Sequence, residues 1–285
     1  RNTDCVLAQF KMPLGNTVYT GWGVCVALPE DKGCFTMLAY SSKNEYEPVI
    51  ISSIDSIFID NGSFYEAGPV TTFAFPKTKD KSIQLKIADF TVNTVLDADD
   101  IAANEFVIER EFNVLRLYSE SNLRISAWKR YYRQIYRDAF GRLKRPAFDI
   151  YTALRSYAVK TDTNINDYVA EKLLSWTQGF KYERNFQKSD ISSLPGVLSG
   201  QLSSDCDSRS LLLAILLHQM IMDTVLFVSS VYSHAMIGVD LKLPGAKIEV
   251  EGKEYLLGET TAHVPIGRIA QDMSVTENWI GITFP

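Results

Sequence analysis

Short runs of hydrophobic and polar residues alternate through the N-terminal third of the chain. Residues 17–28 and 34–40 are rich in β-branched and aromatic side chains, and the turn sequence PEDKG separates them. Three further runs, 49–60, 70–76 and 82–90, have a similar character and are bounded by Gly, Pro or Asn. Short strands with frequent turn signals predict a small β-sandwich or barrel in this part of the chain.

The hydrophobic pattern takes on a helical period from residue 123 onward, and strands return only near the C-terminus. A helix is predicted over 123–140, and Pro146 suits the first turn of a second helix. The later elements are predicted at 164–180 (helix), 192–204 (loop), 206–220 (leucine-rich helix), and 224–229, 233–241 and 254–261 (strands).

These segments predict an α+β fold in three parts. A β-rich, sandwich-like domain is expected over 1–110, a helical linker over 111–145 and an α+β domain over 146–285. The chain has 285 residues, of which 46% are hydrophobic, so it can bury a sizeable core as one large domain or two ordinary ones.

Charge argues against a dedicated nucleic-acid-binding protein, because the net charge is −5 and the pI is about 5.4. The segment 128–145 is locally basic with tyrosines at helical spacing, which favours the solvated face of an amphipathic helix. No uninterrupted apolar window of about 18 residues occurs, so no membrane span is expected.

The four cysteines are too few for a disulfide framework in a chain of this length. Cys25 and Cys34 flank an expected hairpin, and a disulfide among the first three cysteines is one possibility. The chain begins at Arg1 rather than Met, which together with the β-rich N-terminal region favours a processed, extracytoplasmic protein. The sequence leaves the oligomeric state open.

Cys206 stands between two aspartates where the leucine-rich helix is expected to begin. Ser204 can cap this helix, with Asp207 completing an approximate capping box. Unpaired backbone N–H groups and the helix dipole favour a thiolate in a first turn. Asp205 and Asp207 oppose that effect because nearby negative charge raises the pKa of a thiol. A cationic partner is therefore needed for Cys206 to be reactive.

His234 is the candidate partner. In the strand 233–241, His234 lies on the face opposite Ala235, Ile237 and Val239, whose apolar side chains mark the core side. Glu259, on the next expected strand, can accept the second ring N–H of the imidazole and fix its tautomer. Cys206, His234 and Glu259 thus form a candidate nucleophile, base and orienting acid.

These three motifs, SDCDSRSLLLAILLHQM, VYSHAMIGVDL and EYLLGETTA, resemble the transglutaminase-like superfamily with its papain-like fold. The resemblance covers roughly residues 146–261. It implies a thiol enzyme that acts on amide bonds of a protein or peptide through a thioester. Among bacterial relatives of this type hydrolysis, as in a cysteine peptidase or amidase, is favoured over cross-linking. The chain departs from the family pattern at Ser204, where Gly is usual, and at Glu259, where Asp is usual.

Two rival interpretations remain open: an inactive transglutaminase-like module for binding or assembly, and a structural component of an envelope or surface assembly. Gln201 is a possible second oxyanion donor, although a solvated loop residue is the commoner role. Trp176 and Tyr182 are expected in the core rather than in a substrate platform. Structural or surface roles are favoured for His218, His263 and Arg209, the last through an i, i+4 pair with Asp205. No metal site and no cofactor are expected, because the histidines and cysteines lack ligand spacing.

Overall fold

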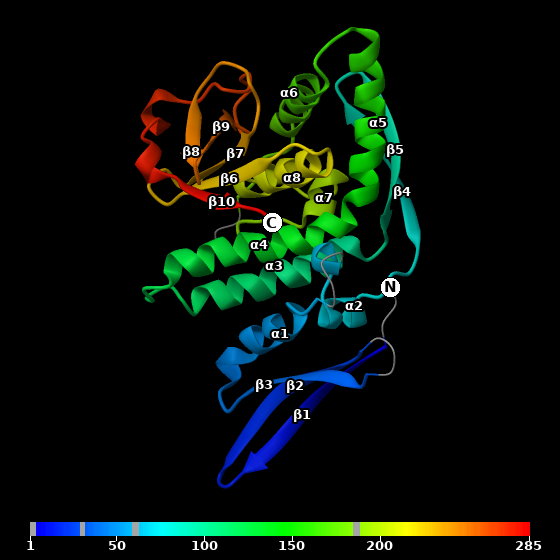
Figure 1. Cartoon of the computed structure of the whole chain (residues 1–285), viewed down its shortest axis with the longest axis vertical. Helices are drawn as coiled ribbons and strands as arrows, with labels where there is room; N and C mark the ends of the chain where they lie inside the picture. Colours follow the sequence, from blue (N-terminus) through cyan, green and yellow to red (C-terminus); the bar gives the residue numbers. More distant parts are fainter. Residues whose placement is uncertain (1–3, 29–31, 59–62, 185–188) are drawn as a thin grey trace.

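The computed structural model of the protein describes residues 4–28, 32–58, 63–184 and 189–285. An antiparallel three-stranded sheet, ordered β1-β2-β3, lies at one end of the molecule (Figure 1). Its strands are β1 (Cys5–Leu14), β2 (Thr17–Ala27) and β3 (Cys34–Ser41). The strands predicted at 17–28 and 34–40 are thereby confirmed, and β1 is an additional strand. All four cysteines lie in the described part of the chain and are free thiols.

The strands predicted at 49–60 and 70–76 are wrong over their described residues. Helices α1 (Glu47–Asp55) and α2 (Pro69–Ala74) occupy these segments, while residues 59 and 60 lie outside the described part. Both helices have a proline in the first turn, where its missing N–H costs nothing. Tertiary packing overrides the β propensity of the isoleucines, because Ile54 packs against Val24 and Val26 of β2.

The N-terminal region is β-rich but is not a sandwich in the residues described. Helices α1 and α2 cover the inner face of the sheet, where a sandwich would place a second sheet. A separate hairpin of β4 (Asp80–Ile87) and β5 (Phe90–Asp97) packs beside α5 (Lys144–Lys160) (Figure 1).

A buried ion-pair network joins α1 to the helices that follow. Arg110 contacts Asp55 at 2.5 Å and Glu111 at 2.9 Å, and Ser52 donates to Glu111 at 2.5 Å. Arg130 adds a further ion pair with Glu111. Removal of one partner from such a network leaves a buried charge uncompensated, so the network holds α1 firmly to α3 (Asp100–Arg116) and α4 (Arg124–Arg142).

The basic helix α4 is only partly the solvated face that its sequence suggests. Arg137 is buried and donates to the backbone carbonyls of Phe64 and Ile57 at 2.6 and 3.1 Å. Arg142 pairs with Asp138 and with Asp100, at 2.8 and 2.9 Å. Several of the basic side chains of this segment therefore form hydrogen bonds and ion pairs within the fold instead of facing solvent.

The helices predicted from residue 123 onward are confirmed as α4, α5, α6 (Ile165–Gln178) and α8 (Cys206–Gln219). A short helix, α7 (Leu194–Leu198), lies inside the segment predicted as a loop. Helix α8 is central, because every residue from Cys206 to Leu217 is buried. A helix that is apolar on most sides requires this kind of burial.

A five-stranded antiparallel sheet, ordered β10-β6-β7-β9-β8, lies against α8 (Figure 1). The three predicted C-terminal strands are confirmed as β6, β7 and β9, and two short strands are additional. The strands are β6 (Thr224–Ser229), β7 (His234–Val239), β8 (Lys247–Val250), β9 (Lys253–Gly258) and β10 (Ile280–Thr283).

Both faces of β7 are covered, which corrects the expectation of one core face. Ala235, Ile237 and Val239 join the main core with α8. Met236, on the opposite face, is fully buried in a second cluster that includes Trp279. His234 lies at the first position of β7, the central strand, and is less buried than the five residues that follow it.

The main core reaches from Leu85 in β4 to Ile282 in β10 and includes side chains of α4, α5, α6 and α8. The domain boundaries predicted near residues 110 and 145 stay predictions. None of the helices in the described ranges is long and apolar enough to cross a membrane.

Candidate functional site

Cys206 is the first residue of α8, as predicted, but the residue that caps the helix is Asp205 rather than Ser204. Asp205 Oδ1 accepts hydrogen bonds from the backbone N–H of Ser208 at 2.9 Å and from its hydroxyl at 2.6 Å. Cys206 is 1% exposed, and its thiol donates to Asp207 Oδ2 at 3.4 Å. The thiol also lies near the backbone N–H of Ala235 on β7.

His234 and Glu259 are hydrogen-bonded to each other. Strands β7 and β9 are neighbours, and the imidazole Nε2 lies 2.7 Å from Glu259 Oε2. The other carboxylate oxygen accepts from the backbone N–H and hydroxyl of Thr261, at 2.7 and 2.6 Å. Burial alone would raise the pKa of Glu259, but the bonds from His234 and Thr261 outweigh it and lower that pKa. Glu259 is therefore an anion beside the imidazole at neutral pH.

Ser210, one turn into α8 from Cys206, contacts the residues that follow His234 and Glu259 in the chain. Its hydroxyl donates to the carbonyl of Ala235 at 3.3 Å and lies 3.1 Å from the hydroxyl of Thr260. Ala235 and Thr260 directly follow His234 and Glu259 in the chain. The start of α8, the start of β7 and the end of β9 therefore meet at one place.

The resting electrostatics keep the thiol protonated. Burial, and then the negative charges of Asp207 and Asp205, raise the pKa of Cys206 well above its usual value, while the Ala235 amide acts in the opposite direction. Burial and the charge of Asp207 also raise the pKa of Asp205 to about 7. One oxygen of this carboxyl, Oδ2, is buried without a hydrogen-bond partner among the described residues.

We expect Asp207→Asn to increase the rate of Cys206 alkylation by iodoacetamide at pH 8 by about tenfold. The amide removes the nearest negative charge, and one unit of pKa corresponds to a tenfold change in thiolate. Peptide mapping after timed labelling measures the rate, with Cys5, Cys25 and Cys34 changed to Ser. Asp205→Asn should have the smaller effect, because Asp205 raises the pKa of the thiol less than Asp207 does. An equal or reversed order would contradict this account.

Asp205 also makes stability depend on pH. Its pKa in the folded chain, about 7, lies above the value of roughly 3.9 in an unfolded chain. The folded state thus binds the extra proton between these values, and stability falls as pH rises from about 4 to about 7. The wild type should therefore lose about 3 kcal/mol of unfolding free energy between pH 5 and pH 8 that Asp205→Asn retains. Urea unfolding at both pH values checks this, and the exposed Asp272→Asn should show the same loss as the wild type.

Arg209 holds the ends of this site together, and not through the predicted pair with Asp205. Its guanidinium donates to Ser204 Oγ at 3.0 Å, to the carbonyl of Thr260 at 3.1 Å and to the carbonyl of Phe180. The side chain is 1% exposed and stacks on the ring of Tyr182, 5.3 Å from its centroid. One residue therefore ties α8 to the segments before it and after β9.

The other sequence candidates lie away from this meeting point or have structural partners. Gln201 is exposed and donates to Ser199, whereas His218 contacts Tyr136 and His263 is exposed. Trp176 packs against the core as expected, but Tyr182 is 50% exposed, which corrects its expected core position.

Sequence reasoning missed Gln178, Tyr132 and Arg184. Gln178 is buried and donates to the carbonyls of Glu259 and Val264, both at 2.8 Å. Tyr132 of α4 donates to Asp207 Oδ1. Arg184 pairs with Asp190 at 3.0 Å and donates to the carbonyl of Ser233 at 3.3 Å. The tyrosines of α4 at helical spacing were the available signal, but they were indistinguishable from core residues.

A cavity of about 290 Å³ opens beside His234 and Asp207. It lies between α3, α4 and the turn that joins β6 to β7. Cys206 does not line it, and Asp207 is the residue that touches both the thiol and the cavity. The site is therefore open to a ligand on the side of His234.

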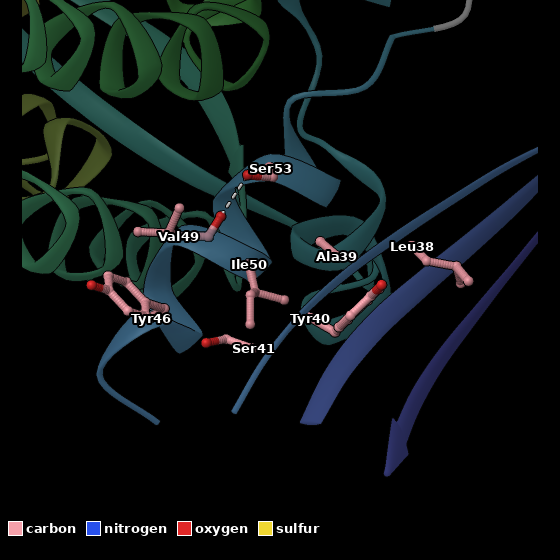
Figure 2. A pocket seen from close by; sticks show the side chains of 8 residues that line it. All are labelled: Leu38, Ala39, Tyr40, Ser41, Tyr46, Val49, Ile50 and Ser53. Atoms are coloured by element: carbon pink, nitrogen blue, oxygen red, sulfur yellow. Dashed lines mark hydrogen bonds between the residues drawn. The ribbon is translucent and has the colours of Figure 1, made fainter. Parts of the chain in front are cut away.

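A larger groove of about 470 Å³ lies on the N-terminal sheet, at the other end of the molecule (Figure 1). Figure 2 shows that side chains of β3 and of α1 with its preceding turn surround it. Among the described residues that line this groove there is no histidine, cysteine, carboxylate or amine. It offers no chemistry comparable to that at His234.

Asp205, Cys206 and Asp207 each offer one ligand atom, and these atoms lie within 4.8 Å of one another. The thiol already donates to Asp207, and Asp205 already caps the helix. Both groups are thus engaged in local structure, and the absence of a metal or cofactor stays a prediction.

No protein-family model, no curated protein and no solved structure matches this chain. The resemblance to the transglutaminase-like superfamily therefore rests on Cys206, His234, Glu259 and the sequences around them.

Proposed function

We propose that the protein is a transglutaminase-like thiol enzyme that acts on amide bonds of a protein or peptide. The observation that carries this proposal is the 2.7 Å contact between His234 and Glu259. It lies where β7 meets α8, because Ser210 donates to the carbonyl of Ala235, and Cys206 is the first residue of that helix. A carboxylate on Nε2 orients the ring and stabilises the imidazolium, so that Nδ1 serves the thiol.

The reaction begins when the Cys206 proton passes to His234 and the sulfur attacks the carbonyl carbon. A C–S bond forms, and the carbonyl electron pair moves to the oxygen, which the N–H of Cys206 stabilises. The C–N bond then breaks, His234 returns the proton to the departing amine, and a thioester remains. Water attacks this thioester in hydrolysis, which releases the acid and restores the thiol, whereas an amine acceptor gives a new amide.

Access to the thiol is part of this proposal. In the resting structure the thiol donates to Asp207 and is 1% exposed. Substrate must therefore displace this hydrogen bond before the thiol can meet Nδ1 of His234.

The same burial favours a second candidate function, an inactive module for binding or assembly. A thiol whose pKa is raised by burial and by two carboxylates is a poor nucleophile at neutral pH. In this alternative the contact between His234 and Glu259 serves only to hold β7 against the end of β9.

Acylation by N-acetyl-phenylalanine 4-nitrophenyl ester distinguishes the two functions. A variant with Cys5, Cys25 and Cys34 changed to Ser is mixed with the ester, and release of 4-nitrophenol and the mass of Cys206 are followed together. The enzyme should show a burst of 4-nitrophenol, an acyl group on Cys206 and slower turnover, all lost in Cys206→Ala. Added glycinamide then separates hydrolysis from amine transfer. Absence of acylation at Cys206 would leave the inactive module as the function.

A further inference from the structure

The cavity beside His234 has an apolar wall built by two helices. Phe112 and Leu115 come from α3, and Trp128, Tyr131 and Tyr132 come from α4. The rings are neighbours, with centroids 5.2 Å apart for Tyr131 and Tyr132, and 6.5 Å apart for Trp128 and Tyr132. The cavity therefore offers a broad aromatic surface to whatever enters it.

The charged groups that line the cavity already have hydrogen-bond or ion-pair partners. Arg184 pairs with Asp190 at 3.0 Å. Asp207 accepts from Tyr132 through one oxygen and from Cys206 through the other. A charged ligand would have to break one of these contacts, whereas an apolar ligand leaves them in place.

Other residues that line the cavity are polar and adjoin the candidate site. Ser229 at the end of β6, and Ser230 and Ser233 of the turn that follows, line it together with His234. An apolar wall faced by a few polar groups is typical of sites that orient a ligand. The volume of about 290 Å³ is at the lower end for ligand sites, roughly 300–1,000 Å³, and suits one large side chain better than a whole drug-sized ligand.

We propose that this cavity receives a bulky apolar side chain, aromatic above all, of the substrate whose amide is attacked at Cys206. The inference rests on the proposed function for the identity of the amide. The cavity itself is defined by α3, α4 and the turn before His234. A cavity of this kind would select substrates that carry a bulky apolar side chain beside the scissile bond.

The test compares two esters, N-acetyl-phenylalanine and N-acetyl-alanine 4-nitrophenyl ester, each normalised to its rate with free 2-mercaptoethanol. We expect kcat/KM for the phenylalanine ester to exceed that for the alanine ester by at least about tenfold. Leu115→Trp, which fills the cavity, should bring the ratio close to one. Leu117→Trp, at the end of the same helix and 40% exposed but outside the cavity, should preserve it. Equal values for the two esters in the wild type would overturn the inference.

A binding measurement separates this inference from the proposed function. If neither ester acylates Cys206, the proposed function fails, and ¹⁹F NMR with N-acetyl-4-fluorophenylalaninamide then reports on the cavity. A signal broadened or shifted by the wild type and restored by Leu115→Trp, but not by Leu117→Trp, supports the cavity as an apolar side-chain site. A signal unaffected by the wild type overturns that assignment.

Discussion

His234→Ala is expected to lower the rate of Cys206 acylation by the phenylalanine ester on the order of 10³-fold. Without the imidazole the thiol proton stays on the sulfur, in its hydrogen bond to Asp207, because Asp207 and Asp205 continue to raise the pKa of the thiol. The Ala235 amide stays in place, because strand β7 is held through its backbone bonds to β6 and β9. The variant therefore tests the role of the imidazole in the reaction, since the fold around Cys206 should be retained.

Two matched changes control for this result. His263→Ala removes an exposed histidine four residues after Glu259 and should leave the rate unchanged. Glu259→Gln should reduce the rate substantially, because the amide cannot stabilise imidazolium, while the exposed Glu249→Gln should have no effect. Stopped-flow release of 4-nitrophenol supplies the rates. A His234→Ala protein that acylates as fast as the wild type would remove the base from the mechanism.

Local patterns predicted the second half of the fold better than the first. The helical period from residue 123 and the short apolar runs of β6 and β7 depend on one buried face or on complete burial, which a sequence displays directly. The isoleucine-rich segment at Ile50–Ile54 fails as a strand because it packs as a helix against Val24 and Val26. That outcome depends on the sheet that α1 covers, which no local window contains.

The candidate site divides in the same way. Cys206, His234 and Glu259 could be chosen as candidates from the sequence, because of their order in the chain and because each lies at the end of a predicted helix or strand. The hydrogen bond from Tyr132 to Asp207 spans 75 residues of sequence, and the aromatic wall of the cavity likewise brings α3 and α4 to the site from a distant part of the chain. Nothing in the spacing of the α4 tyrosines indicated which of them would face the site.

Arg209→Met is expected to destabilise the protein by about 3 kcal/mol. The guanidinium is 1% exposed and has three acceptors, the hydroxyl of Ser204 and the carbonyls of Phe180 and Thr260. Methionine fills similar space but leaves the buried carbonyl of Thr260 and the partly buried carbonyl of Phe180 unpaired, at a cost of roughly 1–3 kcal/mol for a buried group and less for a partly buried one. Removal of a buried positive charge returns part of that cost, because burial itself lowers the pKa of Arg209.

Urea unfolding at pH 7.5 measures the change, and the control is Arg155→Met, at an exposed position of α5, expected within about 0.5 kcal/mol of the wild type. Arg209→Lys keeps the charge but can reach fewer of the three acceptors, so its stability should lie between those of Arg209→Met and the wild type. Thr260 follows Glu259 in the chain, so loss of the hydrogen bonds from Arg209 should also displace Glu259. Cys206 acylation in the folded fraction should therefore fall. An Arg209→Met protein as stable as Arg155→Met would show that the three acceptors find other donors. Arg209 would then not be needed to hold the end of β9 against α8.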